Sequence, residues 1–444
     1  MALAGACRRG EGEAPASTKH EQPARVDEGR CSSWAFVELD TLAPLPDGPH
    51  VATFEAAWEL VRQRHPDPTL RCLPWPQLRR DYGQRIAAAK TSREAYALIN
   101  ELLATLKESH LYAWPPQQAR PRLEGPGPLG RSDARFVIID GRALMVGEAA
   151  RAGGYAGGTV TAVDGVDLKQ LTARRAGGSP GMRGDAQLRA TLDEALRCRV
   201  GQQRELTVVG AGVDGGPPPP RSVEVSCAPL EGALVSLGHL RDVPTRVRAE
   251  MIPETGIGLL AFNVWMLPML PQIREATRSL RTQGMTHLLM DLRGNPGGVG
   301  SMVIPVGRML MREDTSLGEL ILRDHVQRLV VAGDPDAFAG PITVLVDEAT
   351  ASTSEIFAQG MRDIGRATVV GVQTSAGMAL PSVIESLPDG GVLQLVVGHH
   401  RSPSHRAPEG RGVTLDATLS LGLGALAEHD DPVRAAALRW MLRE

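Results

Sequence analysis

The sequence predicts an α/β fold in which a helical region and a β-rich region precede a core of alternating strands and helices. Three observations predict it. Apolar residues recur at helical spacing within residues 34–120, short β-branched runs dominate residues 130–228, and strand–loop–helix units repeat through residues 231–444. Such repeated units favour a largely parallel sheet with helices on its faces. Residues 1–33 are polar and rich in Glu, Arg, Pro and Gly, so we expect a disordered leader.

Length and composition limit the classes of function. A chain of 444 residues exceeds one ordinary domain, and its hydrophobic content of 42% is enough for several cores. The net charge of −3 argues against an electrostatic nucleic-acid binder. The five cysteines show no metal-ligand pairing, and no apolar run is long enough to span a bilayer. We expect no metal and no cofactor. The oligomeric state is not determined by the sequence.

The first residues bear on location. The opening M-A-L-A-G-A-C-R-R-G resembles the end of a bacterial lipoprotein signal, with small residues leading into Cys7, but the basic segment and most of the apolar segment are absent. This predicts a protein of the bacterial cell envelope or periplasm, with a cytoplasmic location as the alternative.

The helical region, residues 34–120, ends in a short polar motif. Its last predicted helix runs into L-K-E-S-H-L-Y-A-W, which places Ser109 and His110 at or just past the helix end. A histidine there also occurs for a simpler reason, because a helix C-terminus favours a positive charge. Lys107 lies one turn before His110, and we expect it to be a surface lysine.

The β-rich region, residues 130–228, carries the phrase A-G-G-T-V-T-A-V-D-G-V-D-L, which resembles the central hairpin of PDZ domains. The resemblance implies that this insert recognises the C-terminus of a peptide or protein substrate by adding a strand to a sheet edge. A clear G-L-G-F-type carboxylate-binding loop is lacking between Arg135 and Gly147. We therefore give this interpretation less weight than the catalytic one below.

The stretch from Val344 to Gly377 is the strongest candidate for chemistry. An apolar run, 342–346, predicts a buried strand, and apolar spacing in residues 355–364 predicts a helix. Ser352 falls between them, where free backbone N–H groups at a helix start stabilise an oxyanion. Helix capping is the alternative for Ser352, and it is the commoner role of a serine at such a place.

Four motifs stand in a recognisable order: D-L-R-G-N-P-G-G from Asp291, A-S-T-S-E from Ala351, D-I-G-R-A-T-V-V-G from Asp363 and E-G-R-G-V from Glu409. Their order resembles that of the tail-specific, or C-terminal processing, serine peptidases, which are related to the core of tricorn protease. The resemblance covers about residues 50 to 420. It implies a crotonase-like α/β core that carries a serine peptidase site.

The resemblance also implies roles for residues around the nucleophile. Ser352 matches the family's nucleophile, while Ser354 caps or packs. The Gly-rich turn matches the segment that supplies an oxyanion N–H, which we place at Gly298, with Gly297 as the second choice. The other donor is expected to be the N–H of Thr353.

The general base departs from one branch of the family. The C-terminal processing branch uses a lysine at the position of Gly377, and this chain has no lysine after Lys169. The tricorn-like branch uses a histidine preceded by a serine, together with a late glutamate. Ser109-His110 and Glu409 match that set, so we expect His110 to be the base, with activity rising around pH 6 to 7.5. A glutamate in a loop is more often simply solvated, which is the alternative for Glu409.

The leading hypothesis is a serine peptidase that forms an acyl-enzyme on Ser352. Two alternatives remain: a non-peptidase acyl hydrolase or transferase acting on a small or specialised substrate, and a non-catalytic relative that binds a peptide or another ligand. His399, His400 and His405 form a cluster that suggests a metal site. Without paired carboxylates or cysteines nearby, we interpret them as loop residues that line a substrate groove.

Overall fold

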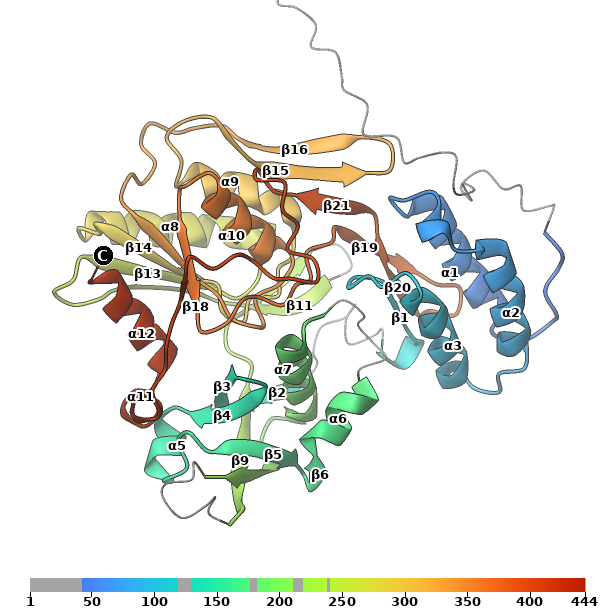
Figure 1. Cartoon of the computed structure of the whole chain (residues 1–444), viewed down its shortest axis with the longest axis horizontal. Helices are drawn as coiled ribbons and strands as arrows, with labels where there is room; N and C mark the ends of the chain where they lie inside the picture. The colour runs from blue at the N-terminus through green and yellow to red at the C-terminus, as the bar shows by residue number, and fades with distance from the viewer. Residues whose placement is uncertain (1–41, 119–128, 176–181, 211–218, 238–239, 444) are drawn as a thin grey trace, which may run out of the picture.

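The structure is a computed structural model that describes residues 42–118, 129–175, 182–210, 219–237 and 240–443. The predicted leader at residues 1–33, with Cys7, and residues 119–128 lie outside the described residues. Figure 1 shows a group of helices at one side, a β-rich region below, and a layered core of strands and helices.

The first region is helical, as its apolar spacing predicts. It contains α1 (Val51–Arg64), the 3-10 turn η2 (Leu70–Cys72), α2 (Trp75–Ala87) and α3 (Ser92–Ala104). Trp58 and Trp75 stack with ring centres 6.1 Å apart, and each indole N–H donates to the other's backbone carbonyl. This pairing satisfies both buried indole donors and joins α1 to α2.

The helical region shares its core with strands from the far end of the chain. Strand β1 (Tyr112–Trp114) pairs antiparallel with β20 (Val392–Val396), which pairs in turn with β19 (Ser382–Ser386). Leu393 and Leu395 of β20 are fully buried in the same apolar cluster as the helices. Residues near position 110 are therefore held against residues near position 390.

The β-rich region is an antiparallel sheet with short helices. Its strand order is β3-β4-β5-β8-β9-β2-β7, with β6 (Val166–Asp167) beside β5. The strands are β2 (Leu129–Ser132), β3 (Arg135–Ile139), β4 (Arg142–Val146), β5 (Thr159–Val163), β7 (Arg197–Arg199), β8 (Gln203–Val209) and β9 (Arg221–Pro229). The helices are α5 (Glu148–Ala152), α6 (Leu168–Arg175) and α7 (Gly184–Ala195). A disulfide joins Cys198 on β7 to Cys227 on β9.

A six-stranded sheet forms the centre of the core. Its order is β12 (Val247–Met251), β13 (Ile257–Phe262), β14 (His287–Asp291), β17 (Ile342–Leu345), β18 (Thr368–Gly371) and β22 (Ala417–Thr418). All neighbours from β13 to β22 are parallel, and β12 is antiparallel at the edge. The loops after β14 and β17 therefore leave the same edge of the sheet side by side, which is where ligands bind in open α/β sheets.

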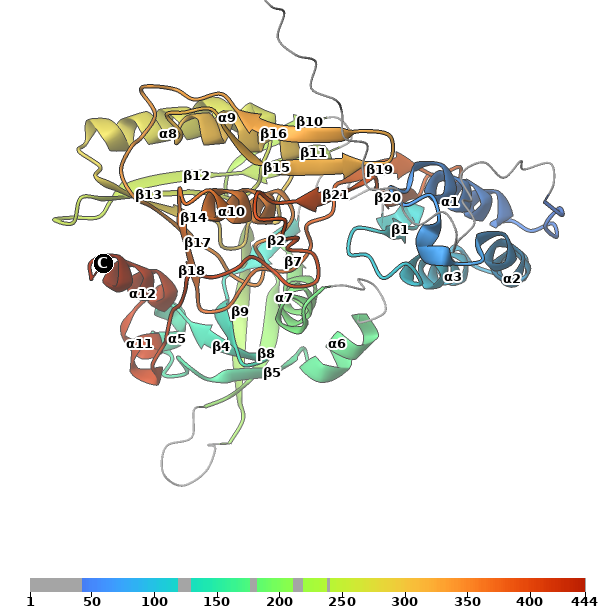
Figure 2. The same ribbon diagram turned by 45° about the horizontal axis from the view of Figure 1, so that its top comes forward.

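Helices cover both faces of this sheet. One face packs against η4 (Leu267–Met269), α8 (Leu270–Thr282), η5 (Gly300–Met302), α9 (Val303–Arg308) and α10 (Thr353–Asp363) in the largest apolar cluster. The other face packs against α11 (Leu423–Glu428), α12 (Pro432–Met441) and side chains of β3 and β4. Figure 2 shows α8 and α9 on one side of the strands and α11 and α12 on the other.

Two smaller sheets complete the fold. One has the order β16-β15-β21, made of β15 (Thr315–Leu322), β16 (Val326–Val331) and β21 (Gly398–Arg401). The other is the hairpin β10 (Ala233–Leu237) and β11 (Leu240–Thr245). The mixed α/β architecture with N-terminal helices and a β-rich region, which the sequence predicts, is confirmed. Within the described residues, no helix is both long and apolar enough to cross a membrane.

Candidate active site

Ser352 lies between β17 and α10 in an unusual backbone conformation. Its φ of 55° and ψ of −120° lie outside the regions that residues with a side chain ordinarily adopt. Such a conformation costs on the order of 1–3 kcal/mol and persists only where the surroundings impose it. Here the Ser352 N–H donates to the Met378 carbonyl at 2.7 Å and to Glu355 Oε2 at 3.1 Å. A plain helix cap does not need this strain, so the observation favours a functional serine.

The Gly-rich turn after β14 lies against Ser352. A Cβ at Gly297 would be 2.6 Å from Ser352 Cβ and 2.8 Å from Thr353 N, and φ at Gly297 is 92°. A Cβ at Gly298, where φ is 141°, would be 2.3 Å from the Trp265 carbonyl oxygen. Only glycine allows the turn to approach the start of α10 this closely.

The two glycines differ as oxyanion donors. The Gly297 N–H donates to Asn295 Oδ1 at 3.0 Å and is therefore occupied. Among the described residues, neither the Gly298 N–H nor the Thr353 N–H has a hydrogen-bond partner. The arrangement favours Gly298 and Thr353 as the donor pair, with Gly297 as their close support.

Ser354 and Asn295 lock the nucleophile loop to the glycine turn. The fully buried Ser354 Oγ accepts a hydrogen bond from Trp265 Nε1 at 2.8 Å and donates to the Asn295 carbonyl at 3.1 Å. The same carbonyl accepts from the Ala351 N–H, and the Asn295 amide donates to the Phe262 carbonyl. Ser354 is therefore a packing residue, as predicted.

Glu355 is a fully buried carboxylate at the first turn of α10. It accepts hydrogen bonds from Ser375 Oγ and from the N–H groups of Gly377, Met378 and Ser352. Burial raises its pKa to about 7, while these hydrogen bonds act in the opposite direction. In the sequence, Glu355 is the last residue of the motif A-S-T-S-E, which by itself indicates no role for it. Its contacts show that it holds the 375–378 segment against Ser352.

His110 lies in the turn between α3 and β1, bonded to its neighbour in the chain. The Ser109 hydroxyl lies 2.8 Å from His110 Nδ1 and 3.0 Å from Glu409 Oε2. Glu409 also accepts from the N–H groups of Ser109 and Ala379. The carboxylate only accepts, so Ser109 donates its proton to Glu409 and accepts from Nδ1–H. The neutral imidazole then carries its free lone pair on Nε2, the nitrogen that a general base uses.

Burial changes the pKa values of both His110 and Glu409. It lowers the pKa of His110 to about 4, which keeps the imidazole neutral at physiological pH. It also raises the pKa of Glu409, against the hydrogen bonds from Ala379 and Ser109 that favour the charged form. Burial therefore acts to place the midpoint below the pH 6 to 7.5 expected for an ordinary histidine base.

The position of the family's lysine is filled by the Glu409 loop. Gly377 has φ of 75°, and a Cβ there would be 3.0 Å from Arg411 N and 3.2 Å from Gly412 N. The Gly410 N–H donates to the Gly377 carbonyl at 2.8 Å. A side chain at position 377 would contact this backbone closely and would be strained by the positive φ, which favours glycine there.

Ser352 and His110 are linked through the segment 378–379. Met378 contacts Ser352, Ala379 contacts Glu409, and Glu409 contacts the Ser109–His110 pair. Within the described residues, no hydrogen bond joins Ser352 directly to His110. The structure thus brings the five residues Ser352, Thr353, Ser109, His110 and Glu409 to one region, with the final proton-transfer contact left to the substrate-bound state.

Helix α7 of the β-rich region packs on the same loops. Ala186 forms a small apolar cluster with Ala351 and Ala376. The guanidinium of Arg183 donates to the carbonyls of Thr374 and Ser375, at 3.2 and 3.1 Å. No sequence motif pointed to this contact, because it depends on how two regions dock.

A second link to α7 is ionic. Arg189 pairs with the buried Glu348 at 3.2 Å, and Glu348 accepts from Gln373 at 3.0 Å. Burial raises the pKa of Glu348 to about 7. The helix therefore contacts the chain on both sides of Ser352.

A cavity of about 80 Å³ lies behind Glu409. Lys107, Glu108, His399 and His400 line it with Glu409, while His405 is exposed in the next turn. Among the described residues, no group of three or more His, Cys, Asp or Glu side chains is arranged to hold a metal ion. His399 and His400 are wall residues of this cavity.

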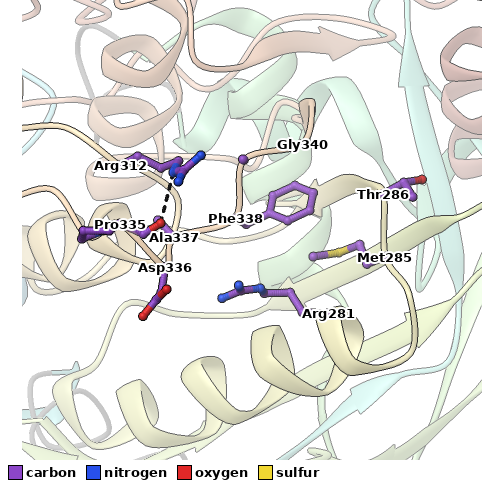
Figure 3. Close-up of a pocket in the computed structure, with 10 residues that line it drawn as sticks. Arg281, Met285, Thr286, Arg312, Pro335, Asp336, Ala337, Phe338 and Gly340 are labelled. Carbon is purple, nitrogen blue, oxygen red and sulfur yellow. Dashed lines mark hydrogen bonds between the residues drawn. The ribbon is translucent and has the colours of Figure 1, made fainter.

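A second pocket, of about 430 Å³, lies away from Ser352. Figure 3 shows Arg281, Arg312, Phe338 and Met285 among the residues that line it. Its residues Thr286 and Gly340 come just before β14 and β17, so it lies at the amino ends of these strands. The candidate active site is at their carboxyl ends, the edge at which parallel sheets ordinarily place function.

Comparisons with known proteins cover most of the chain. Residues 256–419 match the family described as Peptidase family S41, and residues 52–104 match the Tricorn protease C1 domain. The carboxyl-terminal-processing protease of Synechocystis sp. is 27% identical over 384 residues, covering 85% of this chain and 82% of that protein. The protease of the same name from Picosynechococcus sp. is 25% identical over 393 residues, with 86% and 87% covered.

Solved structures share the fold. The photosystem II D1 C-terminal processing protease superposes with a TM-score of 0.59 at 20% identity, covering 88% of this chain and 97% of that one. The structure of mature CPAF gives a TM-score of 0.58 at 12% identity, with 87% and 95% covered.

The fold and the sequence relatives define a serine-type peptidase. More particularly, residues 256–419 match peptidase family S41, and the relatives of the chain include carboxyl-terminal-processing proteases.

The glycine turn provides a sharp test of the site. Gly297→Ala places a methyl group against Ser352 Cβ and Thr353 N, and its φ is unfavourable for alanine. We expect labelling by a fluorophosphonate probe to fall by about 100-fold, because the methyl group would displace the Thr353 N–H and so remove one of the two oxyanion donors.

Gly300→Ala is the matched control, because a Cβ there meets nothing within 4 Å and its φ is not positive. It should label like the wild type. Equal labelling of the two variants would show that the turn does not support the reactive serine.

Proposed function

We propose that this peptidase cleaves peptide bonds through an acyl-enzyme on Ser352, with His110 as general base and Glu409 acting on it through Ser109. The Ser109 bridge carries the proposal. It gives His110 the tautomer that accepts a proton at Nε2, and it connects a half-buried carboxylate to the imidazolium that forms.

Each residue has a defined step. The Ser352 hydroxyl oxygen attacks the peptide carbonyl while its proton moves to His110 Nε2. The oxyanion is stabilised by the N–H groups of Gly298 and Thr353. His110 then gives the proton to the leaving amine, and a water molecule activated by His110 hydrolyses the acyl-enzyme. This arrangement corresponds to the tricorn-like branch of the family rather than to the branch with a lysine base.

Single substitutions test these roles. Ser352→Ala and His110→Ala should each lower kcat/KM on a peptide library by about two to four orders of magnitude. Glu409→Gln should lie between these variants and the wild type, because it keeps the shape of the side chain but removes its charge. Lys107→Ala, on the exposed side of the same turn, should change activity little. Full activity of His110→Ala with Ser352 still essential would place the base elsewhere.

The hydrogen-bonded set Glu409–Ser109–His110, called the relay below, can be tested through the pH dependence of the reaction. His110 must be neutral and Glu409 charged for the proposed reaction. Since burial lowers the pKa of His110 to about 4 and raises that of Glu409, both conditions hold above the two values and are lost as the pH falls through them. We expect kcat/KM to fall as the pH decreases through these pKa values, with the loss that His110 causes centred near pH 4. A midpoint near 7 would contradict this environment for the base.

We also propose that the substrate is recognised at its C-terminus. The names of the carboxyl-terminal-processing relatives and the PDZ-like sequence of the β-rich region support this. A peptide with a free C-terminal carboxylate should be cleaved with kcat/KM about tenfold or more above its C-terminally amidated form, the effect of one charge-assisted contact. Equal rates on the two peptides would remove C-terminal recognition.

The compartment is proposed to be oxidising, such as the bacterial cell envelope. The Cys198–Cys227 disulfide supports this, because disulfides persist mainly outside the reducing cytosol. Some relatives are named as chloroplastic peptidases, including one from Arabidopsis thaliana that is 25% identical over 416 residues. These names give the location of the relatives and not of this chain. Free thiols at both cysteines in intact cells would argue for the cytoplasmic alternative.

A further inference from the structure

The turn that carries Ser109 and His110 has a strained backbone. Lys107 has a φ of 55°, which residues with a side chain rarely adopt. The turn therefore needs contacts that hold it in place. Two such contacts are already described: β1 beyond it pairs with β20, and Ser109 bonds to Glu409. Glu108, between Lys107 and Ser109, makes a third.

Glu108 is held by a fully buried histidine of the helical region. His65 Nε2 lies 2.9 Å from Glu108 Oε2, and the exposed fractions of the two side chains are 0% and 2%. His65 Nδ1 lies 3.1 Å from both the N–H and the carbonyl oxygen of Asp67. The Glu108 carboxylate only accepts, so His65 Nε2 carries a proton and donates to it. This bond attaches the turn to the end of α1.

The other oxygen of Glu108 makes no hydrogen bond within the described residues that compensates for its burial. Glu108 Oε1 is buried and has no hydrogen-bond partner in the described part of the chain. Glu108 and Glu409 line the same cavity of about 80 Å³. A buried carboxylate oxygen without a partner is costly, so its retention next to the relay calls for a functional reason.

We propose that Glu108, held by His65, is a positioning residue for the peptidase site: it fixes the turn that presents His110 and places a second negative charge beside Glu409. The inference rests on the proposed function, because it assigns Glu108 a role only if His110 is the base.

The effect of the Glu108 charge on Glu409 depends on the other charged and titratable groups around the cavity. Arg71 and Lys107 line it and are exposed at its outer side. Burial lowers the pKa of His399, and lowers that of His400 to about 4, so both rings are neutral at physiological pH. His65 faces Glu108 from the α1 side, and the backbone N–H of Asp67 contacts the other ring nitrogen of His65.

Glu108 therefore acts on Glu409 as a like charge. Burial is the main cause that raises the pKa of Glu409, and the charge of Glu108 raises it further. When Glu409 takes up a proton as the pH falls, the relay loses its charge. Removing the charge of Glu108 should lower the pKa of Glu409 and move the acidic limit of activity to lower pH.

Two variants of Glu108 separate the roles. Glu108→Gln keeps an oxygen that accepts from His65 Nε2–H but removes the charge, so kcat at neutral pH should stay within about threefold of the wild type. Its activity should extend to lower pH than that of the wild type. Glu108→Ala releases the turn, and kcat should fall by about 10- to 100-fold with KM nearly unchanged, as expected when a base is displaced by about 1 Å.

Glu101→Gln is the matched control. Glu101 lies on α3 and pairs with Arg85 at the surface, with 52% of its side chain exposed. It should leave kcat, KM and the pH profile as in the wild type. Melting temperatures of all variants show whether any loss comes from unfolding. If Glu108→Ala does not fold, the pH profile of Glu108→Gln still tests whether the charge of Glu108 acts on Glu409.

His110→Ala and Ser352→Ala are measured in parallel on the same short peptide. If both are inactive while Glu108→Ala keeps wild-type kcat, or while Glu108→Gln keeps the wild-type pH profile, the role of Glu108 is wrong and the proposed function stands. If His110→Ala is fully active, the proposed function itself fails, and with it the role of Glu108.

Discussion

The half-buried carboxylate of Glu409 is the contact on which the arrangement of the site depends. It accepts hydrogen bonds from the N–H and hydroxyl of Ser109 in the helical region and from the N–H of Ala379 in the segment after β18. Three stretches of chain, around positions 109, 379 and 409, meet at this one side chain. Burial raises its pKa, and three donors compensate for the lost hydration, so the charge is kept only while all three stretches are in place. The proposed base is thus coupled to the docking of the helices onto the core.

Ser352 shows the same principle in the backbone. Its left-handed φ is imposed by the Met378 carbonyl and by Glu355, a carboxylate that also binds the N–H groups of Gly377 and Met378. The strain at the serine is therefore opposed by a buried network that continues, one residue later at Ala379, into Glu409. Nucleophile loop and relay share the segment 375–379, although no hydrogen bond joins Ser352 to His110 within the described residues.

The lysine that one branch of the family uses as a base corresponds to Gly377 in this chain. A Cβ at Gly377 would lie 3.0 Å from Arg411 N and 3.2 Å from Gly412 N, so the backbone of the Glu409 loop packs closely where a side chain would begin. A histidine from a different stretch lies instead beside the glutamate of that loop, through Ser109. Helix α7 adds a contribution from the β-rich region, because Arg183 and Arg189 contact residues on both sides of Ser352.

Much of this protein is determined by its sequence. The strand–serine–helix stretch at Ser352, the helix end at His110 and the glycines after β14 follow from apolar periodicity and from the backbone freedom of glycine, both local properties. The tertiary structure decided the rest. Gly298 is distinguished from Gly297 by the Asn295 side chain, and the tautomer of His110 by a bridge to a carboxylate 300 residues from Ser109 in the chain. The pKa values of His110 and Glu409, and the roles of Glu355, Glu108 and α7, likewise depend on burial and on contacts between distant stretches. A sequence pattern does not specify these, because desolvation and hydrogen-bond geometry exist only once the chain is packed.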